Sequence, residues 1–192
     1  LVVTELSKET LLDGKEYTRW KFSDGTVYVE GIGSMSETFF HHIADHLPVP
    51  VSYLGSYLVC VSKNNKLLYQ MDDTEMERLG AECLCDVETS YKSQWCDTWN
   101  VMEHDMGMTS DTEKTWRHYL ANDTIINGQT YTSVNYYWTL EESKVYKIAH
   151  VRFSEDKKVY ALMDDTEYLV YDFAVQVGDT IETIVGVGYG SM

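Results

Sequence analysis

The chain has 192 residues, 44% of them hydrophobic and 13% aromatic, so it is long enough to bury a core and too apolar to be disordered. Its 31 acidic and 15 basic residues give a net charge of −16, which repels phosphate backbones and anionic membrane surfaces. We therefore expect no nucleic-acid partner. We also expect no membrane insertion, because no run approaches the roughly 18 apolar residues that a bilayer requires.

The N-terminal part predicts a hairpin followed by a helix. Asp24-Gly25 separates two β-rich runs, Glu16–Phe22 and Thr26–Glu30, and glycine accepts the positive φ that a tight hairpin turn needs. Ser36–Leu47 predicts a helix, because its first residue suits the N-cap position, its apolar residues recur at helical spacing, and a proline follows it.

A segment that occurs twice indicates a repeated hairpin. Ser62–Met76 (SKNNKLLYQMDDTEM) aligns without a gap with Ser154–Tyr168 (SEDKKVYALMDDTEY). In each copy a polar turn separates two β-rich runs. The runs are Val51–Val61 and Lys66–Met71, then Tyr146–Phe153 and Lys158–Met163. After the shared Met-Asp-Asp-Thr-Glu, the first copy predicts a helical turn with a capping box from Thr74 to Glu77, and the second predicts a strand.

The remaining sequence predicts further short strands. A weaker echo pairs LLDGKEYT at Leu11–Thr18 with IINGQTYT at Ile125–Thr132, and the Asn127-Gly128 dipeptide in the second is a hairpin signal. We expect a loop over Glu103–Thr112, which is polar. The other predicted strands are Asp97–Met102, Lys114–Ala121, Thr130–Trp138 and, after a turn at Val177–Thr180, Ile181–Val187. Together these signals predict an all-β fold, an antiparallel sandwich or open barrel built from hairpins, with one short helix near 36–47.

Several phrases together resemble β-rich repeat modules of secreted or surface proteins from Bacteroides-type bacteria. They are Asn127–Tyr131, Asp156–Tyr160, Leu169–Thr180, and Asp13-Gly14 running on to Val29–Ser34. The resemblance covers most of the chain and implies an extracellular or cell-surface module. Those modules have no assigned activity, so the resemblance transfers no catalytic residues.

The order of two of these phrases differs from the family pattern, in which Val-Gly-Asp-Thr precedes Glu-Gly-Ile-Gly. The resemblance then implies a chain cut out of phase from tandem modules, or a permuted or domain-swapped arrangement. On this basis residues 1–96 form a C-terminal-type half-module and 97–192 an N-terminal-type half-module, or both form one combined domain. We expect the segment after Thr180 to lead toward Leu1 and to bring Met192 near it.

Aromatic residues are the candidates for ligand binding. Trp116, Tyr136 and Trp138 are the residues that we select, and alternation along a strand places Tyr136 and Trp138 on one face. Aromatic side chains on an exposed face could bind a glycan. Core packing is the competing explanation, because aromatic side chains dominate β-cores.

One histidine group is the candidate for a metal site. His42 and His46 are four residues apart on the predicted helix, so both rings could face one ion, with His41 beside them. A polar helix face explains the same residues, and no third ligand is fixed by spacing. We therefore expect no cofactor.

The chain has four cysteines. Four cysteines allow three disulfide pairings, and the alternative is that they stay reduced. If a bridge forms, Cys60 with Cys83 or Cys85 is the expected pair, because Cys60 lies on a predicted strand that begins the same segment. Cys83 and Cys85 are too closely spaced for a Cys-x2-Cys zinc pattern.

No set of residues predicts catalysis. The acidic pairs Asp72-Asp73 and Asp164-Asp165 suit solvated turns better than a Ca²⁺ site, and abundant carboxylates alone do not select a glycosidase pair.

We expect a non-catalytic extracellular β-module, an interaction or spacer domain whose partner is an unknown protein or glycan. A carbohydrate-binding or glycan-processing module is the alternative. Unpaired edge strands would also allow two copies to dimerise by strand addition.

Overall fold

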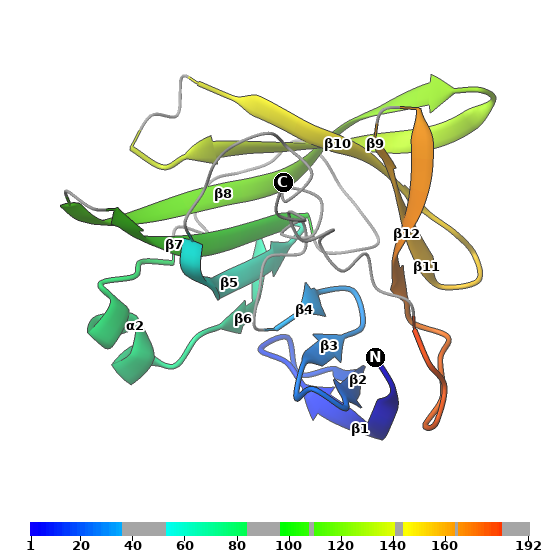
Figure 1. The fold of residues 1–192 in the computed structure, drawn as a ribbon, viewed down its shortest axis with the longest axis horizontal. Coiled ribbons are helices and arrows are strands. Elements are labelled where there is room, and N and C mark those ends of the chain that lie inside the picture. The colour runs from blue at the N-terminus through cyan, green and yellow to red at the C-terminus, as the bar shows by residue number, and fades with distance from the viewer. Residues whose placement is uncertain (36–52, 84–96, 108–109, 141–143, 164, 182–192) are drawn as a thin grey trace, which may run out of the picture.

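The computed structural model describes residues 1–35, 53–83, 97–107, 110–140, 144–163 and 165–181. They form two antiparallel sheets and one short helix, α2 (Figure 1). The all-β fold that the hairpin signals predict is therefore confirmed. The helix predicted over 36–47 lies outside the described residues.

The smaller sheet is built from the N-terminal segment. Its strands pair in chain order: β1 (Val3–Thr10), β2 (Glu16–Phe22), β3 (Val27–Val29) and β4 (Gly33–Ser34). The predicted turn between β2 and β3 is confirmed. Gly25 has a φ of 92°, and the Asp24 carboxylate accepts hydrogen bonds from the N–H and hydroxyl of Thr26 at 3.0 and 2.9 Å.

The larger sheet has eight strands in the order β12-β11-β10-β9-β8-β7-β5-β6. The strands are β5 (Tyr53–Lys63), β6 (Lys66–Gln70), β7 (Thr98–Gly107), β8 (Ser110–Ile126), β9 (Gln129–Trp138), β10 (Tyr146–Phe153), β11 (Lys158–Met163) and β12 (Thr166–Asp172). In Figure 1 this sheet curves, so that β11 and β12 stand steeply to β7 and β8, with the small sheet beneath. It takes strands from both sides of residue 96, and the division into half-modules stays a prediction.

Both copies of the repeated segment begin with a hairpin, as predicted. In the first copy Asn64 and Asn65, with φ of 50° and 61°, turn the chain between β5 and β6. In the second copy Lys157, with φ of 63°, lies in the turn between β10 and β11. The copies then diverge into helix α2 and strand β12. The weaker echo also spans two hairpin turns, β1–β2 and β8–β9.

Two local predictions are wrong. The polar sequence of Glu103–Thr112 predicts a loop, but β7 continues to Gly107 and β8 begins at Ser110. Backbone ladder bonds hold this extension, and they need no apolar alternation in the sequence. Helix α2 (Asp73–Leu79) is capped by Asp72, whose carboxylate accepts the Thr74 N–H at 2.9 Å, so Thr74 is not the cap residue.

One hydrophobic core joins the two sheets. Tyr28 of β3 packs edge-on against Tyr171 of β12 with ring centroids 5.0 Å apart. Trp99 of β7 donates its indole N–H to the Ile32 carbonyl at 3.0 Å, so a polar atom that would otherwise be buried alone is satisfied. A second, smaller core on the other face of the large sheet holds Leu79 of α2 against β5 and β7. None of the described helical residues forms a helix that is long and apolar enough to cross a bilayer.

The segment after β12 returns to the N-terminus. Val3 donates to the Asp179 carbonyl at 2.9 Å, and Ile181 donates to the Leu1 carbonyl at 2.8 Å. The turn predicted at 177–180 is present, with Gly178 at a φ of 95°. Residues 1–3 and 178–181 therefore lie side by side. Met192 and the strand predicted up to Val187 fall outside the described residues.

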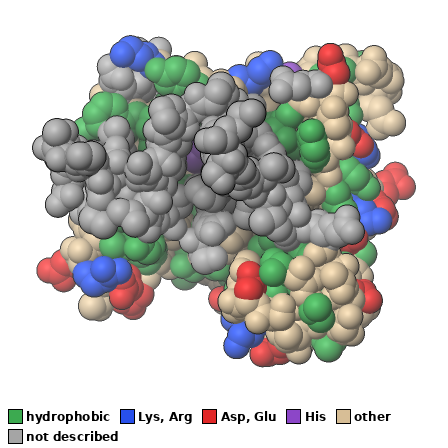
Figure 2. All heavy atoms as spheres, viewed as in Figure 1, with side chains coloured by type: hydrophobic (Ala, Val, Ile, Leu, Met, Phe, Trp, Pro, Cys, Tyr) green, Lys and Arg blue, Asp and Glu red, His purple; other side chains and the backbone are tan. Residues whose placement is uncertain are grey.

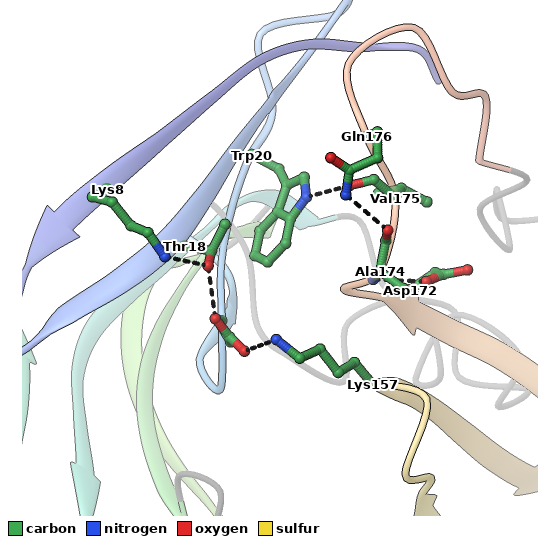
Figure 3. Close-up of polar contacts among 9 residues, drawn as sticks. Lys8, Thr18, Trp20, Lys157, Asp172, Ala174, Val175 and Gln176 are labelled. Atoms are coloured by element: carbon green, nitrogen blue, oxygen red, sulfur yellow. Dashed lines mark hydrogen bonds and ion pairs between the residues drawn. The ribbon is translucent and has the colours of Figure 1, made fainter.

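The two sheets also meet through polar contacts. Lys157 from the β10–β11 turn pairs with Glu30 at 2.9 Å, and the Thr18 hydroxyl donates to the other oxygen of that carboxylate at 2.8 Å. Lys8 donates in turn to Thr18 at 2.9 Å. Figure 3 shows these contacts beside Trp20, whose indole donates to the Val175 carbonyl. Hydrogen bonds and packing together fix the small sheet against the end of the large one.

Candidate functional site

The register of the large sheet brings aromatic rings together on the face of the main core. His118 of β8 is paired with Tyr136 of β9, and Tyr136 is paired with Tyr146 of β10. Trp116 is two residues before His118 and lies on the same face. Tyr136 is the centre of the group: its ring centroid is 5.5 Å from Trp116, 5.6 Å from His118 and 5.2 Å from Tyr146. We call Trp116, His118, Tyr136 and Tyr146 the aromatic strip.

The structure places the three predicted ligand-binding residues on one face of adjacent strands. Trp116 is the direct cross-strand partner of Trp138, and both are half-buried, as is Tyr136. Two of them, Trp116 and Tyr136, belong to the strip; its other members, His118 and Tyr146, are not singled out by the sequence. The Asn127-Gly128 turn sets the β8–β9 pairing, but a bulge between Leu120 and Asp123 shifts the register that a simple count would give.

Exposure increases along the strip toward β10. His118 is 6% exposed and Tyr146 is 45% exposed. Val145 beside Tyr146 is 50% exposed, and Leu140 just beyond the end of β9 is 79% exposed. Large apolar side chains exposed together commonly mark an interaction surface. We call Leu140, Val145 and Tyr146 the apolar end of the strip.

The indole nitrogen of Trp116 is a buried polar atom of the strip. Within the part of the chain that the structure describes, the indole N–H of Trp116 has no acceptor. Trp20 and Trp99, by contrast, each donate to a backbone carbonyl. An unsatisfied buried donor costs about 1–3 kcal/mol, so Trp116 is not placed as an optimised core tryptophan would be.

The neighbouring row of the sheet points to the opposite face and is polar. It runs across four strands, each member being the direct partner of the next, as Cys60, Asn100, Arg117 and Tyr137. Arg117 donates from Nε to Asn100 Oδ1 at 3.0 Å and from Nη1 to the Tyr137 hydroxyl at 2.8 Å. Asn100 Nδ2 donates to Cys60 Sγ at 3.2 Å. We call these four residues the polar row.

Cys60 forms a disulfide with Cys83, one of its two predicted partners, with a sulfur–sulfur distance of 2.10 Å. It joins the centre of β5 to the segment that follows α2. Cys60 is fully buried, and Cys83 is partly buried against the smaller core. The polar row itself is not predictable from sequence spacing, because only the pairing of four strands brings these distant residues together.

A serine and a histidine also lie close together, on β9 and β10. Ser133 Oγ is 3.2 Å from His150 Nδ1, and Lys147 Nζ is 3.1 Å from His150 Nε2. A lysine only donates, so Nε2 accepts and Nδ1 carries the ring proton toward Ser133. Burial, and secondarily the charge of Lys147, lowers the pKa of His150. This tautomer cannot take a proton from Ser133, and a cation replaces the carboxylate of a catalytic triad.

The predicted metal residues His41, His42 and His46 lie outside the described residues. Among the side chains that the structure does describe, no group of three or more His, Cys, Asp or Glu could hold a metal ion. Asp72 is used as a helix cap, and Asp165 adopts a turn conformation with φ of 61°. Figure 2 shows acidic side chains spread around the described part of one face, with basic side chains among them.

Comparison with protein-family models, with curated proteins and with solved structures finds no match to this chain. The resemblance to Bacteroides-type modules therefore stays a prediction.

Proposed function

We propose that this protein is a non-catalytic extracellular β-module that serves as an interaction or spacer domain. The observation that carries the proposal is the apolar end of the aromatic strip. Leu140, Val145 and Tyr146 are between 45% and 79% exposed, and the Tyr146 ring lies 5.2 Å from the half-buried Tyr136 ring. Such a surface gains free energy when a partner covers it, at about 25 cal/mol for each Å² of apolar area removed from water.

Two further observations support an extracellular module. The Cys60–Cys83 disulfide suits an oxidising compartment, where such bonds form and persist. The net charge of −16 favours solubility and disfavours phosphate-rich partners. The Ser133–His150 pair has the wrong tautomer for nucleophilic catalysis, which supports a binding role over a hydrolytic one.

Site-specific photo-crosslinking tests the interaction role. A benzophenone amino acid at position 140 is compared with the same group at position 125, in cells that secrete the protein. Leu140 and Ile125 are 79% and 75% exposed, but Ile125 lies in the β8–β9 hairpin, away from the strip. We expect a discrete adduct at 140 that is absent at 125 and is lost with Tyr146→Ala. Equal labelling at both positions would rule out the apolar end as the interaction surface.

A carbohydrate-binding module is the second candidate, and the aromatic strip favours it. Aromatic rings with polar tips can pack against the apolar face of a sugar ring while hydrogen bonding to its hydroxyls. The acidity of the chain favours a neutral glycan over an anionic one.

Affinity gel electrophoresis in soluble neutral polysaccharides, such as mannan and xylan, tests this candidate. We expect retardation that Tyr146→Ala abolishes and Tyr168→Ala retains, since Tyr168 is a comparably exposed tyrosine on β12. Absence of retardation by either polysaccharide would remove the support for this candidate. An increase in reducing ends during incubation would contradict a non-catalytic module.

A further inference from the structure

The orientation of the Asn100 amide in the polar row is fixed by Arg117. A guanidinium only donates hydrogen bonds, so the Asn100 atom that faces Arg117 Nε at 3.0 Å must be the carbonyl oxygen. The amide nitrogen must then point the other way, where it donates to Cys60 Sγ at 3.2 Å. A rotated amide would place its nitrogen against the cation and its oxygen against the sulfur. The row therefore aims a donor at one sulfur of the disulfide.

The positive charge behind this donor is deeply buried. Arg117 is 2% exposed, and its partners are the neutral side chains of Asn100 and Tyr137, with the Tyr137 ring 5.7 Å from the guanidinium carbon. No ion pair joins it to a carboxylate of the described residues. A buried cation that lacks a counter-charge stabilises an anion formed nearby. A thiolate on Cys60 would be such an anion.

The geometry points to a redox-sensitive latch, in which the Cys60–Cys83 disulfide is opened by a dithiol reductant. A thiolate of the reductant attacks the more accessible sulfur, on Cys83, and forms a mixed disulfide, while Cys60 leaves as a thiolate that accepts the Asn100 N–H, with the charge of Arg117 behind that amide. The second thiol of the reductant then releases Cys83 and completes a disulfide in the reductant. Two electrons pass to the Cys60–Cys83 pair, and Cys83 leaves as a thiolate that takes up a proton. A leaving thiolate of lowered pKa makes this exchange faster.

Opening the disulfide would release helix α2 from the large sheet. The helix has only seven residues, which is too short to be stable without packing. Leu79, Ala81 and Cys83 hold it and its following segment against Val59 and Met102. The disulfide is the covalent part of this attachment, so its loss weakens the whole attachment.

The first test is the substitution Asn100→Asp, with the disulfide equilibrium measured in dithiothreitol buffers by thiol alkylation. The substitution keeps an oxygen for Arg117 but removes the donor to Cys60 and adds a negative charge beside it. We expect a disulfide at least about tenfold harder to reduce, equivalent to about 30 mV for a two-electron couple. Asn135→Asp is the matched control, since Asn135 lies on the same face without contacting the disulfide, and it should leave the equilibrium unchanged. An Asn100→Asp protein that is reduced as easily as the wild type would overturn the proposal.

A second test decides the question if Asn100→Asp does not fold. In Cys83→Ser the Cys60 thiol is free, and its titration is followed by thiolate absorbance. We expect a pKa below the ordinary cysteine value of about 8.5. A pKa at or above that value would show that burial outweighs Asn100 and Arg117, and the latch would be rejected.

Limited trypsin digestion tests the release of α2. Arg78 lies in the last turn of the helix, and Lys157 lies in an exposed turn far from the disulfide. Reduction of the wild-type protein should speed cleavage after Arg78 about tenfold and leave cleavage after Lys157 unchanged. Equal protection of Arg78 in both redox states would overturn the release of the helix.

Discussion

Trp20 and Val175 are joined by a hydrogen bond of 3.0 Å although 155 residues separate them in the chain. The indole N–H of Trp20, on β2, donates to a backbone carbonyl in the segment that follows β12. Trp20 is only 3% exposed, and its ring packs at 5.4 Å against Phe173. One side chain thus supplies both an apolar contact and a hydrogen bond between the small sheet and the segment after β12.

Trp20→Phe should reveal the contribution of this hydrogen bond to the stability of the fold. The variant keeps an aromatic ring but leaves the Val175 carbonyl without its donor, so we expect a loss of about 2 kcal/mol in the free energy of unfolding. Trp116→Phe is the control, because the Trp116 N–H has no acceptor within the described ranges and should cost about 1 kcal/mol less. Urea denaturation followed by circular dichroism measures both. Equal losses would mean that ring volume, and not the hydrogen bond, dominates at both positions.

The hairpins could be predicted because their turns are local. The Asn127-Gly128 turn of β8–β9 and the Asn64-Asn65 turn of β5–β6 have positive φ at both residues, which favours glycine and asparagine. The polar extension of β7 and β8 could not be predicted in this way. Its pairing is set by backbone bonds to the neighbouring strand and leaves no hydrophobic alternation in the sequence.

The candidate site was only partly predictable. Alternation predicts the common face of Tyr136 and Trp138, and the hairpin adds Trp116. Tyr146 joins them through a different strand pair, whose register contains an irregularity between Lys147 and Ala149. The polar row from Cys60 to Tyr137 depends on three successive strand registers, and no sequence spacing encodes it.

Gly128→Ala should destabilise the β8–β9 hairpin through backbone strain alone. Gly128 has a φ of +79°, and a Cβ added there would meet nothing within 4 Å. An L-residue in this conformation costs about 1–2 kcal/mol, which thermal denaturation would detect as a lower Tm. Gly128→Asn should lose less, because asparagine tolerates positive φ better than alanine. If both substitutions cost the same, the strain explanation is wrong.

Glu30→Gln should make the protein less sensitive to acid. Burial acts to raise the pKa of Glu30, but hydrogen bonds from Lys157 and Thr18 outweigh it and the net pKa is lowered. A carboxyl whose pKa is lowered by folding contributes stability above its unfolded pKa, and that stability is lost as pH falls through the folded value. The change should therefore flatten the stability profile below about pH 4.5 while costing less than about 1 kcal/mol at neutral pH. A profile that steepens in Glu30→Gln would contradict the argument.

Asp97→Asn should have the opposite pH signature. Asp97 is fully buried before β7, where its Oδ2 accepts the Asn64 N–H at 2.6 Å and fixes the β5–β6 turn. Burial is the largest influence and raises its pKa, against the opposing hydrogen bonds from Asn64 and Thr98. The folded state therefore binds this proton more tightly than the unfolded chain does, and the associated stability is lost as pH rises through the folded pKa.

Asparagine is neutral at every pH and keeps an oxygen for the Asn64 N–H. The variant should gain stability relative to wild type as the pH rises above the ordinary aspartate pKa of about 3.9, measured by urea denaturation at each pH. A relative stability that falls over this range would show that the hydrogen bonds, and not burial, govern Asp97.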